Sequence, residues 1–151
     1  MKQTHKYETN SHSCFLLSYH LVVVTKFRHP VITDDLKNRL IEVSHNILEG
    51  DWGCRISEIN TDVDHIHILF HASPSIKLCD LVNNYKTVTS RYIRKEFKDE
   101  LSKYYWKPYF WSDAYFVGTV GDTTEDIIKD YIAEQGRKKR VYHHKAKNTN
   151  I

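Results

Sequence analysis

The order of hydrophobic and polar positions predicts a strand and then a helix at the start of the chain. Residues 14–27 are rich in Leu, Val, Phe and Tyr, which predicts a strand that ends before Pro30. Apolar side chains then recur at helical spacing over residues 34–48. Thr33 is the expected N-cap of this helix and Gly50 its expected C-terminal stop.

A hairpin is predicted next. Residues 52–60 alternate in polarity, which would place Ile56 and Ile59 on opposite faces of a strand. Residues 64–72 predict a second strand that follows almost at once. The short link between them, residues 61–62, favours a hairpin.

A second helix, a fourth strand and a third helix complete the pattern. The second helix is expected to open at residues 73–75. Its apolar stripe consists of Leu78, Leu81, Val82, Tyr85, Val88, Tyr92 and Ile93. Residues 106–120 predict an aromatic loop that leads into a strand. Thr123 or Thr124 then caps a last helix over residues 125–135.

The order of elements indicates the fold class. Strand, helix, strand, strand, helix and strand, with one further helix, is typical of an α+β, ferredoxin-like fold, also called split βαβ or RRM-like. Such a fold is a four-stranded antiparallel sheet with helices on one face. The length of 151 residues and the hydrophobic content of 40% fit one domain over residues 1–151.

Composition excludes several classes of protein. No stretch approaches the roughly 18 consecutive apolar residues of a membrane helix, so no membrane association is expected. The first residues lack the apolar segment of a secretory signal. Cys14, Cys54 and Cys79 are too few and too widely spaced for a disulfide framework or a zinc knuckle. These features predict a cytoplasmic protein.

The positive charge is concentrated at the C-terminus. The net charge is +3, yet residues 137–151 contain six basic side chains and no acidic one, so acidic residues outnumber basic ones before this tail. A basic tail favours a polyanionic partner such as nucleic acid. It is equally consistent with a solubilising end that binds nothing.

The most informative segment is the strand that carries His65, Ile66 and His67. Residues two apart in a strand share a face, so the two imidazoles point the same way, about 6.5–7 Å apart. Two imidazoles at this separation suit one divalent ion and leave open positions for a third ligand, water or a phosphate oxygen.

Two other interpretations of these histidines stay open. The pair is also consistent with two polar residues on the wet face of a sheet, since the chain has 10 histidines. With His71 on the same face, a zinc triad and a zinc hydrolase are a further alternative.

The last predicted helix places Tyr131 and Gln135 one turn apart on one face. Periodicity alone favours a tyrosine packed on the core of the domain, because nothing local marks it as a nucleophile.

Taken together, four segments resemble the single-tyrosine HUH transposases of small bacterial and archaeal insertion sequences, of the single-strand-transposing, IS200-like type. HUH denotes two histidines around a bulky apolar residue, as in His65-Ile66-His67. Residues 19–28 resemble the opening strand of the family, and residues 111–121 resemble the strand before its tyrosine helix. Residues 131–135, with Tyr131 and Gln135, resemble that helix.

The resemblance implies an activity and a site. Members of this family cut and rejoin single-stranded DNA through a 5′-phosphotyrosine intermediate. Tyr131 would be the nucleophile, and His65 and His67 would hold a divalent metal, Mg²⁺ or Mn²⁺, with Gln135 as the third protein ligand. No nucleotide cofactor is expected, because the chain has no Gly-x-x-x-x-Gly-Lys loop.

The resemblance also implies partners. Family members act as homodimers on single-stranded DNA with hairpin ends, and the tyrosine helix can act in trans. Cationic residues that could contact DNA phosphates are Lys26, Arg28, Lys86, Arg91 and Arg94. Aromatic residues that could stack on unpaired bases are Trp106, Tyr109, Phe110 and Trp111.

The competing function class is a protein that binds nucleic acid without cutting it. An RRM-like RNA-binding domain is disfavoured because its aromatic RNP run is absent. A domesticated relative that binds hairpins without catalysis would carry the same motifs, and so stays an alternative.

Overall fold

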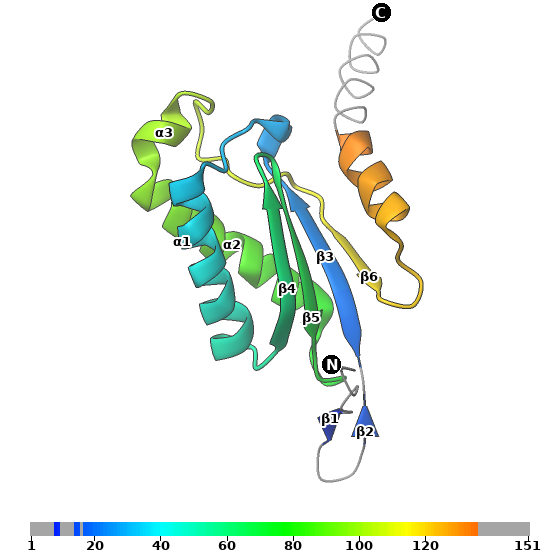
Figure 1. The fold of residues 1–151 in the computed structure, drawn as a ribbon. Coiled ribbons are helices and arrows are strands. Elements are labelled where there is room, and N and C mark those ends of the chain that lie inside the picture. Colours follow the sequence, from blue (N-terminus) through cyan, green and yellow to red (C-terminus); the bar gives the residue numbers. More distant parts are fainter. Residues whose placement is uncertain (1–7, 10–13, 16, 136–151) are drawn as a thin grey trace, which may run out of the picture.

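The computed structural model describes residues 8–9, 14–15 and 17–135 (Figure 1). A short antiparallel pair, β1 (Glu8–Thr9) and β2 (Cys14–Phe15), precedes the main body of the chain. The basic tail over residues 137–151 and the expected helix stop at Gly136 lie outside the described residues.

The body is built on one four-stranded antiparallel sheet. Its strands are β3 (Ser18–Val24), β4 (Arg55–Asp62), β5 (His65–His71) and β6 (Phe116–Thr119). Their order across the sheet is β4-β5-β3-β6, with β5 and β3 in the centre. This order and the helices between the strands confirm the predicted α+β, ferredoxin-like fold.

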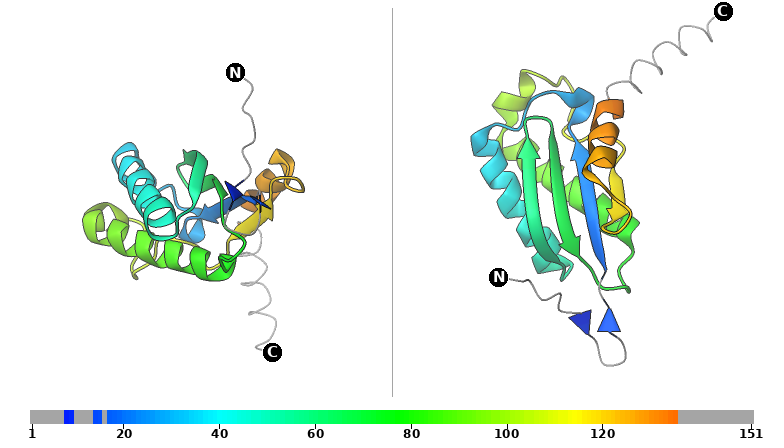
Figure 2. Two further views of the ribbon diagram at one scale, coloured as in Figure 1. Left: turned by 90° about the horizontal axis from the view of Figure 1, so that it is seen from below. Right: turned by 45° about the vertical axis from the view of Figure 1, so that its right-hand side comes forward.

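Successive side chains of β3 and β5 point to opposite faces of the sheet, and both faces carry buried residues. On one face, Leu21 pairs with Ile68 and Val23 with Ile66, and all four are fully buried. This face packs against α1 (Asp34–His45) and α2 (Leu78–Glu96) (Figure 2). The main hydrophobic core therefore lies between the sheet and these two helices.

A second, smaller core lies on the opposite face. Val22 and Val24 of β3 are fully buried there against Ile128 of the last helix, residues 125–135. Figures 1 and 2 show this helix on the side of the sheet that faces away from α1 and α2. Its N-cap is Thr124, whose Oγ1 accepts a hydrogen bond from the backbone N–H of Ile127 at 3.3 Å. The last helix is thus held on the sheet by apolar contacts.

The first long strand ends earlier than predicted. β3 stops at Val24, and Lys26–Arg28 form a 3-10 turn instead of the end of a strand. Phe27 and Arg28 have φ angles of 60° and 54°, a region that side-chain-bearing residues seldom adopt. The hydroxyl of Tyr105 donates a hydrogen bond to the carbonyl of Lys26 at 2.7 Å, which helps to fix the turn.

Two local irregularities also differ from the prediction. The first helix does not stop at Gly50, because a π-helical segment (Asn46–Asp51) extends it, and the left-handed residue is Gly53, with φ of 65°. In β4 a bulge lies between Ile56 and Glu58, so Ile56 and Ile59 both pack on the main core. The expected alternation over residues 52–60 is therefore wrong.

The hairpin and the long helix are displaced from their predicted limits. Residues 61–62 belong to β4, and the two-residue turn of the hairpin consists of Val63 and Asp64. α2 begins at Leu78 and not at residues 73–75. A short helix, α3 (Lys98–Ser102), follows it and was not predicted. No helix among residues 17–135 is long and apolar enough to cross a bilayer.

Candidate active site

The two histidines of β5 lie on the face of the sheet that carries the last helix. His65 pairs across the strands with Val24, and His67 pairs with Val22. Cross-strand partners share a face, and Val22 and Val24 are the residues on which the last helix packs. The histidine pair and Tyr131 are therefore on the same face of the sheet, which is here called the histidine face.

Tyr131 is held on this face by aromatic packing. Its ring centroid lies 5.5 Å from that of Phe116 in β6, and it packs with Ile132 against the small core. Its hydroxyl is buried, and no described residue provides a hydrogen-bond partner. Burial raises the pKa of Tyr131 to about 12, because a phenolate is poorly solvated there.

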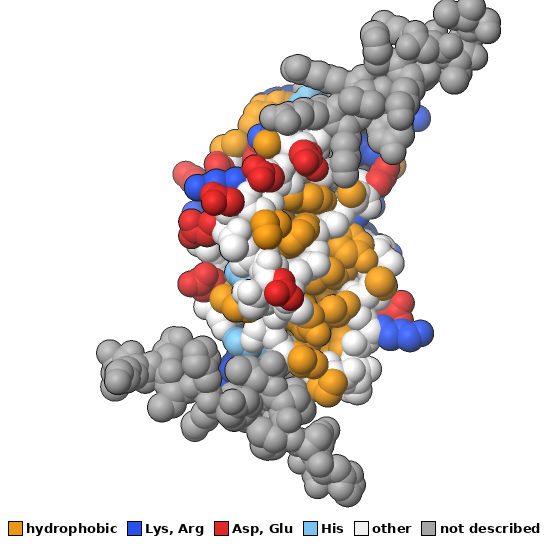
Figure 3. All heavy atoms as spheres, turned by 90° about the vertical axis from the view of Figure 1, so that its right-hand side faces the viewer, with side chains coloured by type: hydrophobic (Ala, Val, Ile, Leu, Met, Phe, Trp, Pro, Cys, Tyr) orange, Lys and Arg blue, Asp and Glu red, His pale blue; other side chains and the backbone are white. Residues whose placement is uncertain are grey.

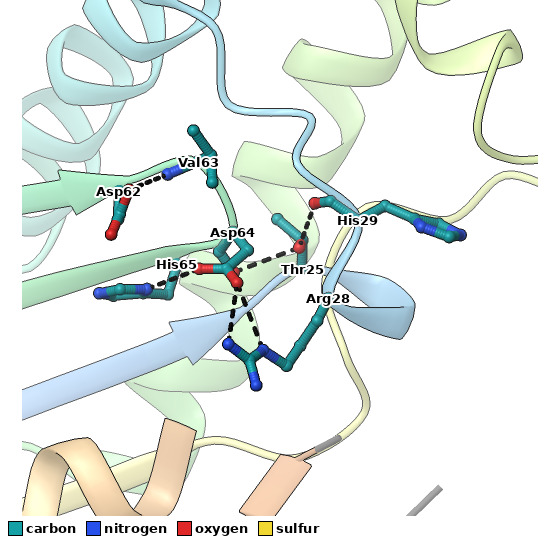
Figure 4. Close-up of polar contacts among 7 residues, drawn as sticks. All are labelled: Thr25, Arg28, His29, Asp62, Val63, Asp64 and His65. Atoms are coloured by element: carbon teal, nitrogen blue, oxygen red, sulfur yellow. Dashed lines mark hydrogen bonds and ion pairs between the residues drawn. The ribbon is translucent and has the colours of Figure 1, made fainter. Parts of the chain in front are cut away.

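His65 is held by a chain of polar contacts (Figure 4). Its Nδ1 lies 2.8 Å from Oδ1 of Asp64, and Nε and Nη2 of Arg28 donate to Oδ2 of the same carboxylate at 3.3 and 3.2 Å. Because an ionised carboxylate only accepts hydrogen bonds, Nδ1 of His65 carries the proton. In the neutral ring the lone pair is then on Nε2, so this is the nitrogen with which His65 can bind a metal.

His67 is paired with a histidine of the neighbouring strand. Nδ1 of His20 and Nε2 of His67 are 2.7 Å apart, a hydrogen-bond distance. Burial lowers the pKa of His67, and the nearby His20 lowers it further. Burial also lowers the pKa of His20 itself. Both rings are thus favoured in their neutral form, in which a nitrogen lone pair is available.

Gln135 and His71 are placed differently from the pair. Nε2 of Gln135 lies 3.5 Å from the carbonyl oxygen of Tyr131, so this amide contacts its own helix. His71 lies at the far end of β5, where its Nδ1 contacts Oγ of Ser18 at 2.5 Å and its Nε2 contacts Oγ of Ser57 at 2.6 Å. These contacts disfavour a zinc triad that includes His71.

The donor set fits a divalent cation with several open positions. Within residues 17–135, no group of three or more His, Cys, Asp or Glu side chains is arranged to hold a metal ion. His65 and His67 supply two imidazoles on one face, and the unpartnered hydroxyl of Tyr131 is on that face as well. Such a set leaves room for an amide oxygen, water and substrate oxygens to complete the shell.

Comparison with known families decides the assignment. The family model described as "Transposase IS200 like" matches residues 13–135, which is most of the chain. The chain belongs to the IS200-like transposase family. The match spans the histidine strand, the last helix and every strand of the main sheet.

Curated members of the IS200-like transposase family are similar over most of their length. The ISDra2 transposase TnpA of Deinococcus radiodurans is 27% identical over 124 residues, covering 82% of this chain and 87% of that protein. The transposase for insertion sequence element IS200 of Salmonella typhimurium is 29% identical over 126 residues, covering 83% of this chain and 80% of that protein.

Solved structures agree with this assignment. A crystal structure of a protein from Deinococcus radiodurans assigned as a transposase matches with a TM-score of 0.78 and 27% identity, covering 85% of this chain and 97% of the other. The structure of a REP-associated tyrosine transposase bound to a REP hairpin matches with a TM-score of 0.51 and 11% identity, covering 86% and 74%. At that identity the second match shows the fold alone.

The two lysines predicted to contact DNA in this family member converge on one acidic residue, Asp113. Nζ of Lys26 lies 3.2 Å from Oδ2 of Asp113, and Nζ of Lys86 donates to the backbone carbonyl of Asp113 at 2.8 Å. Burial lowers the pKa of Lys86. Both lysines therefore contribute to the packing of the loop before β6.

The predicted arginines are spread over two regions. Arg28 is bound to Asp64 beside the histidine face. Arg91 is exposed on α2, and Arg94, one turn later, donates from Nε to Oγ of Ser90 at 3.1 Å. The five predicted cations thus do not form one patch.

The aromatic residues predicted to stack on bases divide into two groups. Phe110 and Trp111 are 1% and 6% exposed and belong to the main core, so the prediction for them is wrong. Nε1 of Trp111 donates to Oγ1 of Thr89 inside that core. Trp106 is 74% exposed and Tyr109 is partly buried, so both remain candidates.

Two residues of the site were not predicted from the sequence. His20 meets His67 only through the register of β3 on β5, which a single sequence does not give. Asp64 had a local signal, because it directly precedes His65 and a carboxylate beside a histidine commonly orients the ring.

Proposed function

We propose that this protein cuts and rejoins single-stranded DNA at insertion-sequence ends through a 5′-phosphotyrosine intermediate. The observation that supports the proposal best is the common face shared by Tyr131, His65 and His67, which come from elements far apart in the sequence. A phenol and two neutral imidazoles on one face suit a metal-assisted attack on a phosphodiester.

The chemistry needs no external energy source. The phenol oxygen of Tyr131 loses its proton as it attacks the phosphorus, and the bond from phosphorus to the 3′ oxygen breaks. The leaving oxygen takes a proton and becomes a free 3′-OH. One phosphodiester replaces another, so a 3′-OH can later attack the phosphotyrosine, reseal a strand and return the phenol.

His65 and His67 would hold the metal, with Gln135 as the third protein ligand and Mg²⁺ or Mn²⁺ as the ion. When bound, the ion would polarise the scissile phosphate and stabilise negative charge on the attacking oxygen. Asp64 keeps the proton of His65 on Nδ1, away from the ligand nitrogen. Binding through Nε2 of His67 requires that this nitrogen exchange its contact with His20, and Gln135 must turn from the carbonyl of Tyr131.

We further propose that the protein acts as a homodimer. β6 is an edge strand of the sheet, and Val120 and Ile127 beside it are 43% and 41% exposed. Figure 3 shows hydrophobic side chains gathered in a band on the side of the molecule where Figure 1 places β6 and the last helix. A second copy would cover this band, and its tyrosine helix could then act in trans.

The substrate would be single-stranded DNA with hairpin ends. Among the cations predicted to contact DNA, Arg28 is linked to the histidine pair: it binds Asp64, and Asp64 binds His65. Because its side chain is partly exposed, it can also approach a backbone phosphate beside the site.

A covalent-adduct assay tests the proposal. The protein is incubated with Mn²⁺ and single-stranded DNA from the ends of its own element, and the products are separated on a denaturing gel. A DNA-linked protein band is expected, and Tyr131→Phe should abolish it while hairpin binding persists. His65→Ala and His67→Ala should also lose the band.

Matched controls come from the same chain. Tyr92→Phe and His45→Ala alter an exposed tyrosine and an exposed histidine on the helical side, and both should form the adduct like the wild type. Adduct formation by Tyr131→Phe at the wild-type level would show that another group is the nucleophile. Hairpin binding without any adduct in the wild type would favour the non-catalytic alternative.

A further inference from the structure

A recessed site, separate from the histidine face, lies between the end of α2 and the loop that follows α3. It is a hollow of about 330 Å³. Its aromatic lining residues are Tyr105, Trp106 and Tyr109, and its charged lining residues are Arg94, Lys98 and Lys107. Of the described residues that line it, none is acidic. This site is here called the aromatic pocket.

The aromatic side chains of the pocket are fixed against one another. Trp106 stacks on Phe27 with ring centroids 5.9 Å apart and an interplanar angle of 12°, although the tryptophan is 74% exposed. Tyr109 meets Trp106 edge-on at 6.1 Å and 88°. A held indole that keeps most of its surface in solvent is a platform for another planar ring.

The cations of the pocket lack acidic partners. Arg94, Lys98 and Lys107 form no salt bridge with any residue in the described part of the chain, and Nε of Arg94 donates a hydrogen bond to the hydroxyl of Ser90. Three positive charges around an aromatic surface complement a ligand that combines flat rings with negative charge. Nucleic acid with unpaired bases has this chemistry.

A strained turn joins the aromatic pocket to the histidine face. Phe27 and Arg28 both have positive φ angles, which are costly for residues other than glycine and therefore indicate a role. This conformation lets the ring of Phe27 stack on Trp106 while the guanidinium of Arg28 reaches Asp64, the neighbour of His65. Figure 1 shows this turn, α3 and the tip of the β4–β5 hairpin at the same end of the molecule.

We propose that the aromatic pocket binds an unpaired base of single-stranded DNA. The base would stack on Trp106 and Tyr109, and the flanking phosphates would contact Arg94, Lys98 and Lys107. The inference rests on the proposed function, because it assigns the place where part of that substrate is held beyond the histidine face.

Fluorescence anisotropy with a labelled oligothymidylate of about 12 nucleotides tests the pocket without a hairpin, and without metal, so no cleavage is needed. Trp106→Ala should weaken binding about 5- to 150-fold, the equivalent of one lost base stack. The double variant Lys98→Gln, Lys107→Gln should reduce the slope of log Kd against log salt by about 1.4. Because Trp106 is exposed, its replacement leaves the core intact.

Two controls lie on α2 outside the aromatic pocket. Tyr92→Ala removes another exposed aromatic ring, and Lys95→Gln removes another exposed lysine. Both should bind the oligothymidylate within about twofold of the wild type. Wild-type affinity in Trp106→Ala, or an equal loss in Tyr92→Ala, overturns the inference. A wild-type protein that binds through Trp106 yet forms no covalent adduct would overturn the proposed function and leave the aromatic pocket standing.

Discussion

The carboxylate of Asp64 lies 2.8 Å from Nδ1 of His65 and thereby decides which nitrogen of that ring is free. Arg28 holds the other oxygen of the same carboxylate, so the group is fixed from two sides. The orientation of His65 is therefore determined outside the histidine pair itself. The affinity of a metal bound by His65 would therefore depend on Asp64, although the metal would not contact Asp64.

Asp64→Ala should weaken Mn²⁺ binding about 10- to 100-fold, because the ring loses its fixed orientation and its protonated Nδ1. Isothermal titration calorimetry with Mn²⁺ measures the affinity, and ¹⁵N NMR of the histidines measures the tautomer in the absence of metal. In the variant the NMR signal of His65 should change toward a mixture of tautomers. Asp35→Asn, an exposed substitution in α1, is the control. An unchanged Mn²⁺ affinity in Asp64→Ala would show that Asp64 does not position His65.

The His20–His67 pair predicts a dependence of stability on pH. The pKa of both rings in the folded protein is below the ordinary value of 6.5, chiefly because of burial. The unfolded chain therefore binds more protons as the pH falls below about 6.5, and the free energy of unfolding should decrease in that window. His20→Gln should reduce this decrease, because one of the two buried rings is removed. Urea unfolding at pH 7.5 and 5.5 measures the effect, and equal wild-type stability at both values would contradict it.

Gly118 fixes the approach of the last helix to the sheet. A Cβ at this position would lie 2.3 Å from Oγ1 of Thr123 and 3.0 Å from Cζ of Phe116, the ring on which Tyr131 packs. Gly118→Ala should lower the free energy of unfolding by about 1–3 kcal/mol through overpacking. It should also increase hydrogen exchange over residues 125–135.

Two variants isolate the cause of the Gly118 effect. Gly121→Ala should be close to neutral, because no atom lies within 4 Å of its added Cβ. Adding Thr123→Ala to Gly118→Ala should restore part of the lost stability, since it removes the closest clash. Failure of Thr123→Ala to restore any stability would place the strain at Phe116 instead.

The fold was predictable where apolar residues recur at one regular spacing along a whole strand or helix. In β5, Ile66, Ile68 and Phe70 are fully buried and alternate with histidines and Leu69, so the sequence alone indicated both the strand and the shared face of His65 and His67. The order of strands and helices likewise led to the observed sheet.

The errors in the predicted fold arise where the backbone departs from regular strand or helix geometry. The bulge at Ser57 turns Ile59 to the same face as Ile56. Nothing in the sequence around Ser57 indicates a bulge. Phe27 and Arg28 adopt positive φ without being glycine in a turn that the hydroxyl of Tyr105 and the ring of Trp106 hold. Such features depend on contacts between segments distant in sequence, which a local pattern does not contain.

The candidate site was predictable in composition and not in detail. His65, His67 and Tyr131 were named from the HUH and tyrosine-helix patterns, and the structure places all three on one face. The contacts of His20 with His67 and of Gln135 with its own helix depend on register and rotamer. Neither is encoded in the spacing of the motif.

The hydroxyl of Tyr131 should stabilise nothing in the folded protein and should instead cost free energy. It is buried without a partner among the described residues, whereas the fully buried hydroxyl of Tyr85 meets Oγ of Ser44 at 2.8 Å. Tyr131→Phe should therefore raise the free energy of unfolding by about 1 kcal/mol, and Tyr85→Phe should lower it by about 1 kcal/mol. Urea unfolding of both variants measures the opposite signs. Because Tyr131→Phe is also expected to abolish the covalent adduct, a gain in stability with a loss of activity would indicate that this hydroxyl is kept for chemistry. A loss of stability in Tyr131→Phe would show that the phenol has a partner in solution.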